Sequence, residues 1–108
     1  MSVLSTHILN TSNGLPVEGV KVTYRAHGTI VASAVTNSDG RVGDLLIGKV
    51  LTAGSHTLTF EVGAYFSAQE QESFFQEINV DFVVIDVNRN YHIPLLLSPF
   101  SFTTYRGS

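Results

Sequence analysis

The sequence predicts an all-β chain folded as a β-sandwich, and three observations support this. Over much of the 108 residues, apolar and polar side chains alternate with a period of two, the pattern of a strand with one buried face. Turn-forming pairs such as Asn13-Gly14 and Asp39-Gly40 interrupt this alternation at short intervals. Seven or eight short strands at this spacing are typical of a β-sandwich.

The expected strands can be placed in order. Residues 20–26, VKVTYRA, put Val20, Val22 and Tyr24 on one side, and residues 29–36 follow across His27-Gly28, which predicts a hairpin. The other strands are expected at residues 5–10, 56–62, 78–87, 91–97 and 100–105.

Residues 63–75, GAYFSAQEQESFF, lack the alternation and contain Ala, Gln and Glu. This composition predicts a helix of two or three turns that packs Tyr65, Phe66 and Ala68 against a sheet. Because no linker or internal repeat is visible, we expect one domain that covers residues 1–108.

Composition excludes several function classes. With six Lys and Arg residues and a net charge of −3, the chain has no basic surface for nucleic acid or anionic membrane. The absence of cysteine excludes disulfides, thiolate zinc sites and cysteine nucleophiles. No signal peptide is visible and no apolar run approaches the ~20 residues of a membrane span, so we expect a cytoplasmic protein. The low charged fraction, 14%, suggests that some surface is buried in an oligomer.

Generic catalytic motifs such as G-x-S-x-G and H-E-x-x-H do not occur, which leaves the histidines, the arginines and the polar tail TTYRGS as candidates. His7 lies within the first strand, and His92 alternates out of phase with Tyr91 and Ile93, so it should face away from their side of the sheet. Taken alone, such strand histidines are more often solvated than catalytic. His27 and His56 are expected at the surface.

Proline at position 94 predicts that its strand is bulged or edge-like, because proline cannot donate to a ladder. Arg41 leaves the turn NSDGR, and Arg106 lies near the end of the chain. Each of the two arginines, taken alone, is most simply an exposed charge.

Together, the segments LSTHILN, TNSDGR and YHIPLLLSPFSFTTYRGS resemble the transthyretin-like family, specifically its 5-hydroxyisourate hydrolase branch. The resemblance extends from Leu4 to Ser108. The final YRGS is the discriminating motif, because the hormone-carrying transthyretins resemble this chain elsewhere but do not end in that tetrapeptide.

The resemblance implies a transthyretin-like β-sandwich of two four-stranded sheets with one short helix, assembled as a homotetramer from two dimers, with active sites in the channel between the dimers. It implies hydrolysis of 5-hydroxyisourate to 2-oxo-4-hydroxy-4-carboxy-5-ureidoimidazoline in urate breakdown, without a metal or an organic cofactor. A carrier that binds aromatic ligands in the same channel is the alternative, and a structural sandwich without chemistry is a third reading.

Matched by motif, the family's catalytic residues correspond to His7, Arg41, His92 and Ser108, and its substrate-binding residues to Tyr105, Arg106 and Gly107. Histidine suits the chemistry because its ordinary pKa of ~6.5 lies near neutrality, and a planar guanidinium matches an oxygen-rich ring that gains negative charge. One histidine is expected to activate water while the other holds the substrate or protonates the leaving nitrogen, and the sequence leaves this assignment open. The carboxylate of Ser108 is expected to belong to the site.

Overall fold

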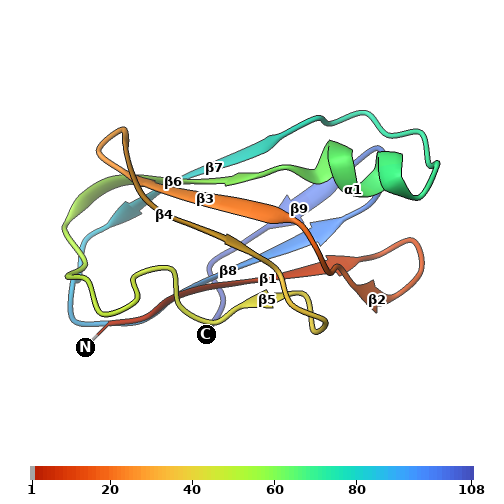
Figure 1. The fold of residues 1–108 in the computed structure, drawn as a ribbon. Coiled ribbons are helices and arrows are strands. Elements are labelled where there is room, and N and C mark those ends of the chain that lie inside the picture. Colours follow the sequence, from red (N-terminus) through yellow and green to blue (C-terminus); the bar gives the residue numbers. More distant parts are fainter. Residues whose placement is uncertain (1) are drawn as a thin grey trace.

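The computed structural model describes residues 2–108 as two β-sheets packed face to face (Figure 1). One sheet has the order β2-β1-β8-β9, with β5 also paired to β1, and the other has the order β4-β3-β6-β7. The elements are β1 (Leu4–Asn10), β2 (Leu15–Pro16), β3 (Lys21–Ala26), β4 (Thr29–Val35), β5 (Arg41–Val42), β6 (Gly54–Phe60), α1 (Val62–Ala68), β7 (Ile78–Val84), β8 (Tyr91–Leu97) and β9 (Phe102–Thr104). No helix among these residues is long and apolar enough to cross a bilayer.

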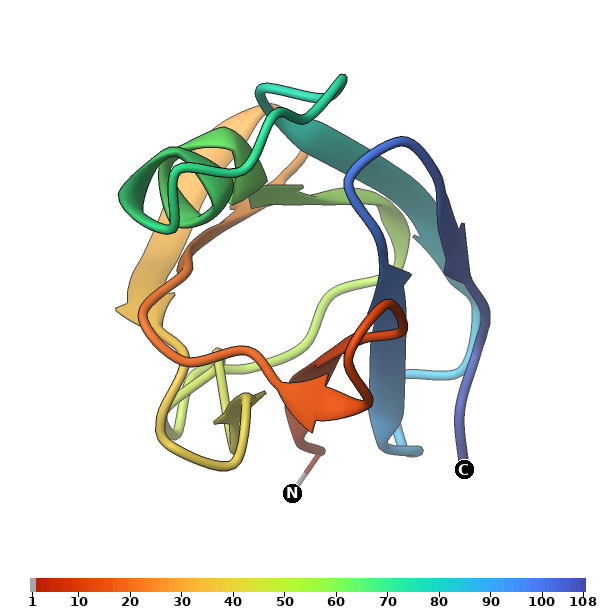
Figure 2. The same cartoon turned by 90° about the vertical axis from the view of Figure 1, so that its right-hand side faces the viewer.

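The core lies between the two sheets, which enclose it in the end-on view of Figure 2. Alternate residues of each central strand supply it, such as Leu4 and Ile8 from β1 and Leu58 and Phe60 from β6, all with no exposed surface. The predicted sandwich with one short helix is therefore confirmed for the described residues.

The structure adds two strands of two residues each, β2 and β5, so that one sheet has five strands rather than four. The helix has about two turns, as the sequence predicts, and it occupies the first part of the expected stretch because it ends at Ala68. Two residues later Glu70 adopts a left-handed φ of 54°, a conformation that cannot continue a helix. At the other end, Val62 starts the helix instead of ending a strand.

His56 corrects one expectation, because it is 1% exposed and lies in the core rather than at the surface. Its Nδ1 lies 2.7 Å from the hydroxyl of Tyr24, and its Nε2 lies 2.8 Å from the carbonyl oxygen of Thr52. A carbonyl only accepts, so Nε2 carries the hydrogen and Tyr24 donates to Nδ1. Burial therefore costs little, because both ring nitrogens are paired.

The β1–β8 ladder pairs two strands from opposite ends of the sequence. These strands run parallel in an unshifted register from Leu4↔Tyr91 to Asn10↔Leu97. A parallel pair needs a long crossover between its strands, and here all the intervening elements provide it. The ladder thus joins the two ends of the sequence in the middle of one sheet (Figure 1).

Candidate active site

The outer face of the five-stranded sheet brings three predicted residues together. His7 pairs with Arg41 across β1 and β5, and His92 pairs with Ser5 across β1 and β8. Directly paired residues point to the same face, and so do alternate residues of one strand. The side chains of His7, Arg41 and His92 therefore share the face that points away from the core, as the phase of His92 predicts.

The turn before β5 fixes Arg41. The side-chain oxygen of Asn37 accepts hydrogen bonds from the backbone N–H groups of Asp39 at 2.9 Å and of Arg41 at 3.0 Å. Gly40 has a φ of 74°, and a Cβ there would lie 2.5 Å from the carbonyl oxygen of Ile8. Only glycine allows the turn to approach β1 this closely.

The expectation for Pro94 is wrong on one side of β8, because β8 lies between β1 and β9 and its ladder with β1 shows no register shift. The N–H of Gly107 donates to the carbonyl of His92 at 2.7 Å, so the backbone groups of His92 point toward β9. Because backbone groups alternate sides along a strand, those of the other even-numbered residues of β8 point the same way. The N–H that Pro94 lacks would thus have bonded to the β9 side. Continuous pairing there stops at Leu95↔Thr104.

Beyond the end of β9, the tail pairs with β8 again at Gly107. Tyr105 and Arg106 lie outside β9, and Gly107 then forms an isolated bridge with His92. A Cβ on Gly107 would lie 2.7 Å from Cδ2 of His92 and 3.2 Å from Cγ of Pro94. The tail backbone therefore packs directly against the imidazole.

The tail residues and two of the three residues above line two adjacent depressions in the surface. The first depression has a volume of about 280 Å³ and the second about 430 Å³. Asn90 and Ser108 line both. The first is lined in addition by Val3, Ser5, Arg41 and His92, and the second by Arg89, Tyr105, Arg106 and Gly107. Six of the seven predicted residues thus line one or the other, while His7 lies beside Arg41 on the same face.

The electrostatics keep both histidines neutral. Burial lowers the pKa of His7 below its ordinary 6.5, and the charge of Arg41 lowers it further, against a smaller opposing effect of Asp39. Burial also lowers the pKa of His92, and Arg41 and His7 act in the same direction, against a smaller opposing effect of the Ser5 backbone. Neutral imidazole therefore predominates for both at pH 7. The guanidinium of Arg41 has no hydrogen-bond or ion-pair partner within residues 2–108, so it is available to a ligand.

Sequence reasoning missed three residues around this face. Ser5 lies 2.8 Å through Oγ from Nδ1 of His92, and Asn90 accepts a hydrogen bond from the N–H of Val3 at 2.9 Å while lining both depressions. Arg89 lines the second. Only Ser5 had a usable signal, since it precedes His7 by two residues and so must share its face.

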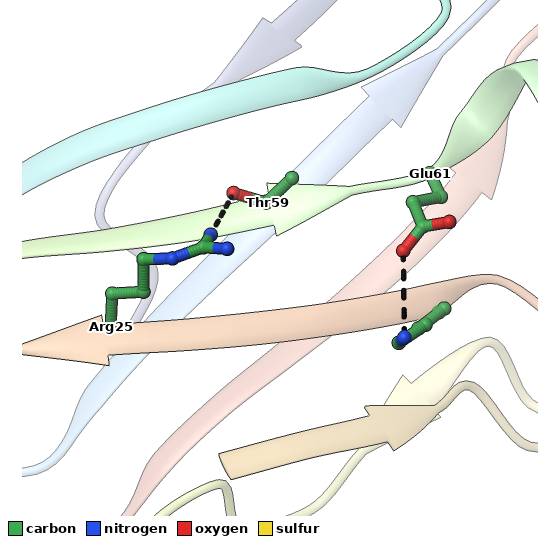
Figure 3. Close-up of polar contacts among 4 residues, drawn as sticks. Arg25, Thr59 and Glu61 are labelled. Carbon is green, nitrogen blue, oxygen red and sulfur yellow. Dashed lines mark hydrogen bonds and ion pairs between the residues drawn. The ribbon is translucent and has the colours of Figure 1, made fainter. Parts of the chain in front are cut away.

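The outer face of the other sheet provides a contrast (Figure 3). There Arg25 donates to Oγ1 of Thr59 at 3.1 Å, and Lys21 lies 4.0 Å from the carboxylate of Glu61. Thr59 in turn donates to Asn79 at 2.7 Å. These polar groups pair with one another, which makes this face a poorer candidate for a reaction. Within residues 2–108, no group of three or more His, Asp or Glu side chains is arranged to hold a metal ion.

Comparisons with known proteins identify the family to which this chain is similar. A family model described as the HIUase/Transthyretin family matches residues 4–107. A protein of Deinococcus radiodurans named 5-hydroxyisourate hydrolase is 42% identical, with 97% of this chain and 95% of that protein covered.

Two solved structures are similar over nearly the whole chain. The 5-hydroxyisourate hydrolase of Klebsiella pneumoniae superposes with a TM-score of 0.92 at 42% identity and covers 100% of both chains. Sea bream transthyretin in complex with thyroxine superposes with a TM-score of 0.87 at 31% identity, over 96% of this chain and 93% of that one. The fold is thus shared by relatives named as a hydrolase and as transthyretin.

Proposed function

This chain belongs to the HIUase/transthyretin family, and we propose that it hydrolyses 5-hydroxyisourate. The observation that carries the proposal is the convergence of His7, Arg41 and His92 on one open sheet face beside the YRGS tail. The relatives named as hydrolases, at 42% identity over nearly full length, favour this reaction over ligand carriage.

The reaction adds water to a ring carbonyl, and the adjacent C–N bond then breaks to open the ring. One proton leaves the attacking water and one proton reaches the departing nitrogen. Neutral histidines suit this exchange, because an unprotonated ring nitrogen can accept the water proton and later return it. The lowered pKa values of His7 and His92 support this state at pH 7.

Arg41 is proposed to stabilise the oxygen that becomes negative as water adds. Its guanidinium is exposed on the histidine face and has no partner among residues 2–108 that would compete. A guanidinium fork can donate two hydrogen bonds to a planar, oxygen-rich ring. After burial, the same charge is the second cause that lowers the pKa of His7 and of His92, so Arg41 also helps to keep both imidazoles unprotonated.

The tail residues Tyr105, Arg106, Gly107 and Ser108 are proposed to bind the substrate. They line the second depression, which adjoins the first through Asn90 and Ser108. Three of the six cationic residues of this net negative chain line the two depressions, namely Arg41, Arg89 and Arg106. Such a cluster favours an oxygen-rich ligand.

A homotetramer is the proposed assembly. The site lies on an open sheet face rather than in an enclosed cavity, so a second copy over that face would exclude water from it. Apolar side chains at the edge of the sandwich remain exposed, among them Val83 at 63% and Tyr105 at 56%, and edge strands of this kind favour pairing between copies. Light scattering at micromolar concentration tests the assembly, and a monomeric mass would contradict it. The cytoplasmic location stays a prediction from the sequence.

The test of the activity is the decay of 5-hydroxyisourate absorbance with purified protein and with the variants His7→Asn and His92→Asn. We expect the wild type to accelerate the decay and each variant to lose about 10²-fold or more, the usual contribution of an acid or base. His27→Asn is the matched control, because His27 is exposed in a turn of the other sheet and its left-handed φ of 52° suits asparagine. Wild-type rates in both site variants would refute the proposal, and saturable thyroxine binding without turnover would favour the carrier reading.

A further inference from the structure

The imidazole of His92 is held at both edges of its ring. At one edge, Oγ of Ser5 lies 2.8 Å from Nδ1. At the other, the backbone of Gly107 is so close that a Cβ there would lie 2.7 Å from Cδ2. Ser5 and His92 are direct partners in the β1–β8 ladder, so the contact is set by the register of the sheet. Nε2 of His92 makes no hydrogen bond within residues 2–108, and the ring is part of the lining of the first depression.

The contact with Ser5 decides which ring nitrogen carries the hydrogen. A neutral imidazole has one N–H, and the hydrogen bond made by one nitrogen fixes the state of the other. Within residues 2–108, Oγ of Ser5 has no second partner. The hydroxyl of Ser5 is therefore free to donate to Nδ1. When it donates, the lone pair of Nδ1 is used and the single ring hydrogen is on Nε2.

We propose that Ser5 is a positioning residue that donates its hydroxyl hydrogen to Nδ1 of His92 and thereby fixes the Nε2–H tautomer. His92 then presents a neutral N–H donor to the depression that also contains Arg41. Ser5 lines the same depression, and its hydroxyl makes its one hydrogen bond within residues 2–108 to His92, so we assign it a role through that imidazole.

This inference rests on the proposed function for its chemical meaning, and it divides the work of the two histidines. A neutral Nε2–H does not release its proton at pH 7, but it can hydrogen-bond the carbonyl oxygen that becomes negative. His92 therefore joins Arg41 in holding that oxygen. The proton of the attacking water passes to His7, which then delivers it to the departing ring nitrogen, so one proton is taken and one is returned.

The tautomer can be read directly in the free protein by long-range ¹H–¹⁵N NMR of ¹⁵N-histidine-labelled samples at pH 8. We expect the wild type to show an unprotonated Nδ1 and a protonated Nε2 for His92, assigned by comparison with His92→Asn. In Ser5→Ala we expect the Nδ1 signal to shift toward the value of a free lone pair, and in Ser5→Thr to stay near the wild type. A protonated Nδ1 in the wild type would overturn the inference.

Kinetics provide a second readout that a merely structural serine would not move. We expect Ser5→Ala to lower kcat about tenfold with little change in KM, because the loss of one positioning hydrogen bond acts on the transition state. Ser5→Thr keeps a hydroxyl and is expected to restore most of kcat. Ser33→Ala, an exposed strand serine of the other sheet, is the matched control and should keep wild-type kinetics. Unchanged kcat in Ser5→Ala would overturn the inference.

The two measurements separate failure of the inference from failure of the proposed function. If the wild type does not hydrolyse 5-hydroxyisourate, the function fails, and the NMR experiment on free protein still decides whether Ser5 fixes the tautomer. If the wild type is active while Ser5→Ala keeps both the wild-type Nδ1 shift and the wild-type kcat, the inference fails and the function stands. Circular dichroism of each variant, with a wild-type spectrum expected, ensures that the comparison is made on folded protein.

Discussion

Replacing Gly107 with alanine should damage activity far more than folding. The added Cβ would lie 2.7 Å from Cδ2 of His92, whereas carbon atoms in contact prefer ~3.5 to 4.0 Å. One of the two groups must therefore move by about 1 Å. Retreat of the tail toward β8 is blocked, because the same Cβ would lie 3.2 Å from Cγ of Pro94 and 3.3 Å from the carbonyl oxygen of His92.

The size of each effect follows from these contacts. A displacement of about 1 Å at a reacting group can cost about 10²-fold in rate, so we expect kcat/KM for 5-hydroxyisourate to fall by about that factor. The folding cost is limited to the bond between the Gly107 N–H and the His92 carbonyl, which is worth about 1 kcal/mol. That loss corresponds to a decrease in Tm of about 5 °C in a domain of this size.

The assay compares initial rates and thermal melts of Gly107→Ala with those of Gly43→Ala. Gly43 is the matched control, because its φ is not left-handed and a Cβ there meets no atom within 4 Å. We expect the control to keep both its rate and its Tm. A Gly107→Ala protein with the wild-type rate would show that neither His92 nor the tail needs its present position, and the reasoning would fail.

Two further predictions concern charge. Stability should fall as the pH drops below about 6.5, because burial lowers the pKa of His56, as it does for His7 and His92, so the unfolded chain binds protons that the folded chain does not. Urea midpoints measured from pH 8 to pH 5 should be constant above the unfolded pKa and decrease below it, and a flat profile would contradict this. Arg41→Lys should lower kcat by about 10²-fold at unchanged Tm, since an exposed guanidinium contributes to the reaction rather than to folding. Wild-type kcat in that variant would remove Arg41 from the mechanism.

The strands were predictable where period-two alternation runs over six or seven residues, as in β1, β3 and β8. Strands of two residues have no period, so β2 and β5 could not be found in the sequence. His56 was misplaced although the signal was present, because it is in phase with Leu58 and Phe60 and must share their inward face. In that case a general preference of histidine for the surface was given more weight than the alternation.

The convergence of the site needed information that periodicity does not contain. Alternation places Ser5, His7 and His92 on outward faces, but it does not say that β1 and β8 are neighbours or in which register they pair. These strands are parallel and more than 80 residues apart in sequence, so no local turn joins them or sets their register. The resemblance to a family supplied the grouping of these residues, and the contact of Ser5 with His92 emerged only from the coordinates.

The role of Pro94 joins the sequence to the geometry of the tail. Its missing N–H falls on the β9 side of β8, so it leaves the β1–β8 ladder intact and coincides with the end of continuous pairing at Thr104. Tyr105 and Arg106 are thereby released to line the second depression, while Gly107 returns to the strand beside His92. The same strand therefore carries the imidazole and, two residues later, the proline that frees the chain beside it. A residue with an N–H at position 94 would favour extending β9 across Tyr105 as far as the existing bridge at Gly107, which would hold Tyr105 in the strand.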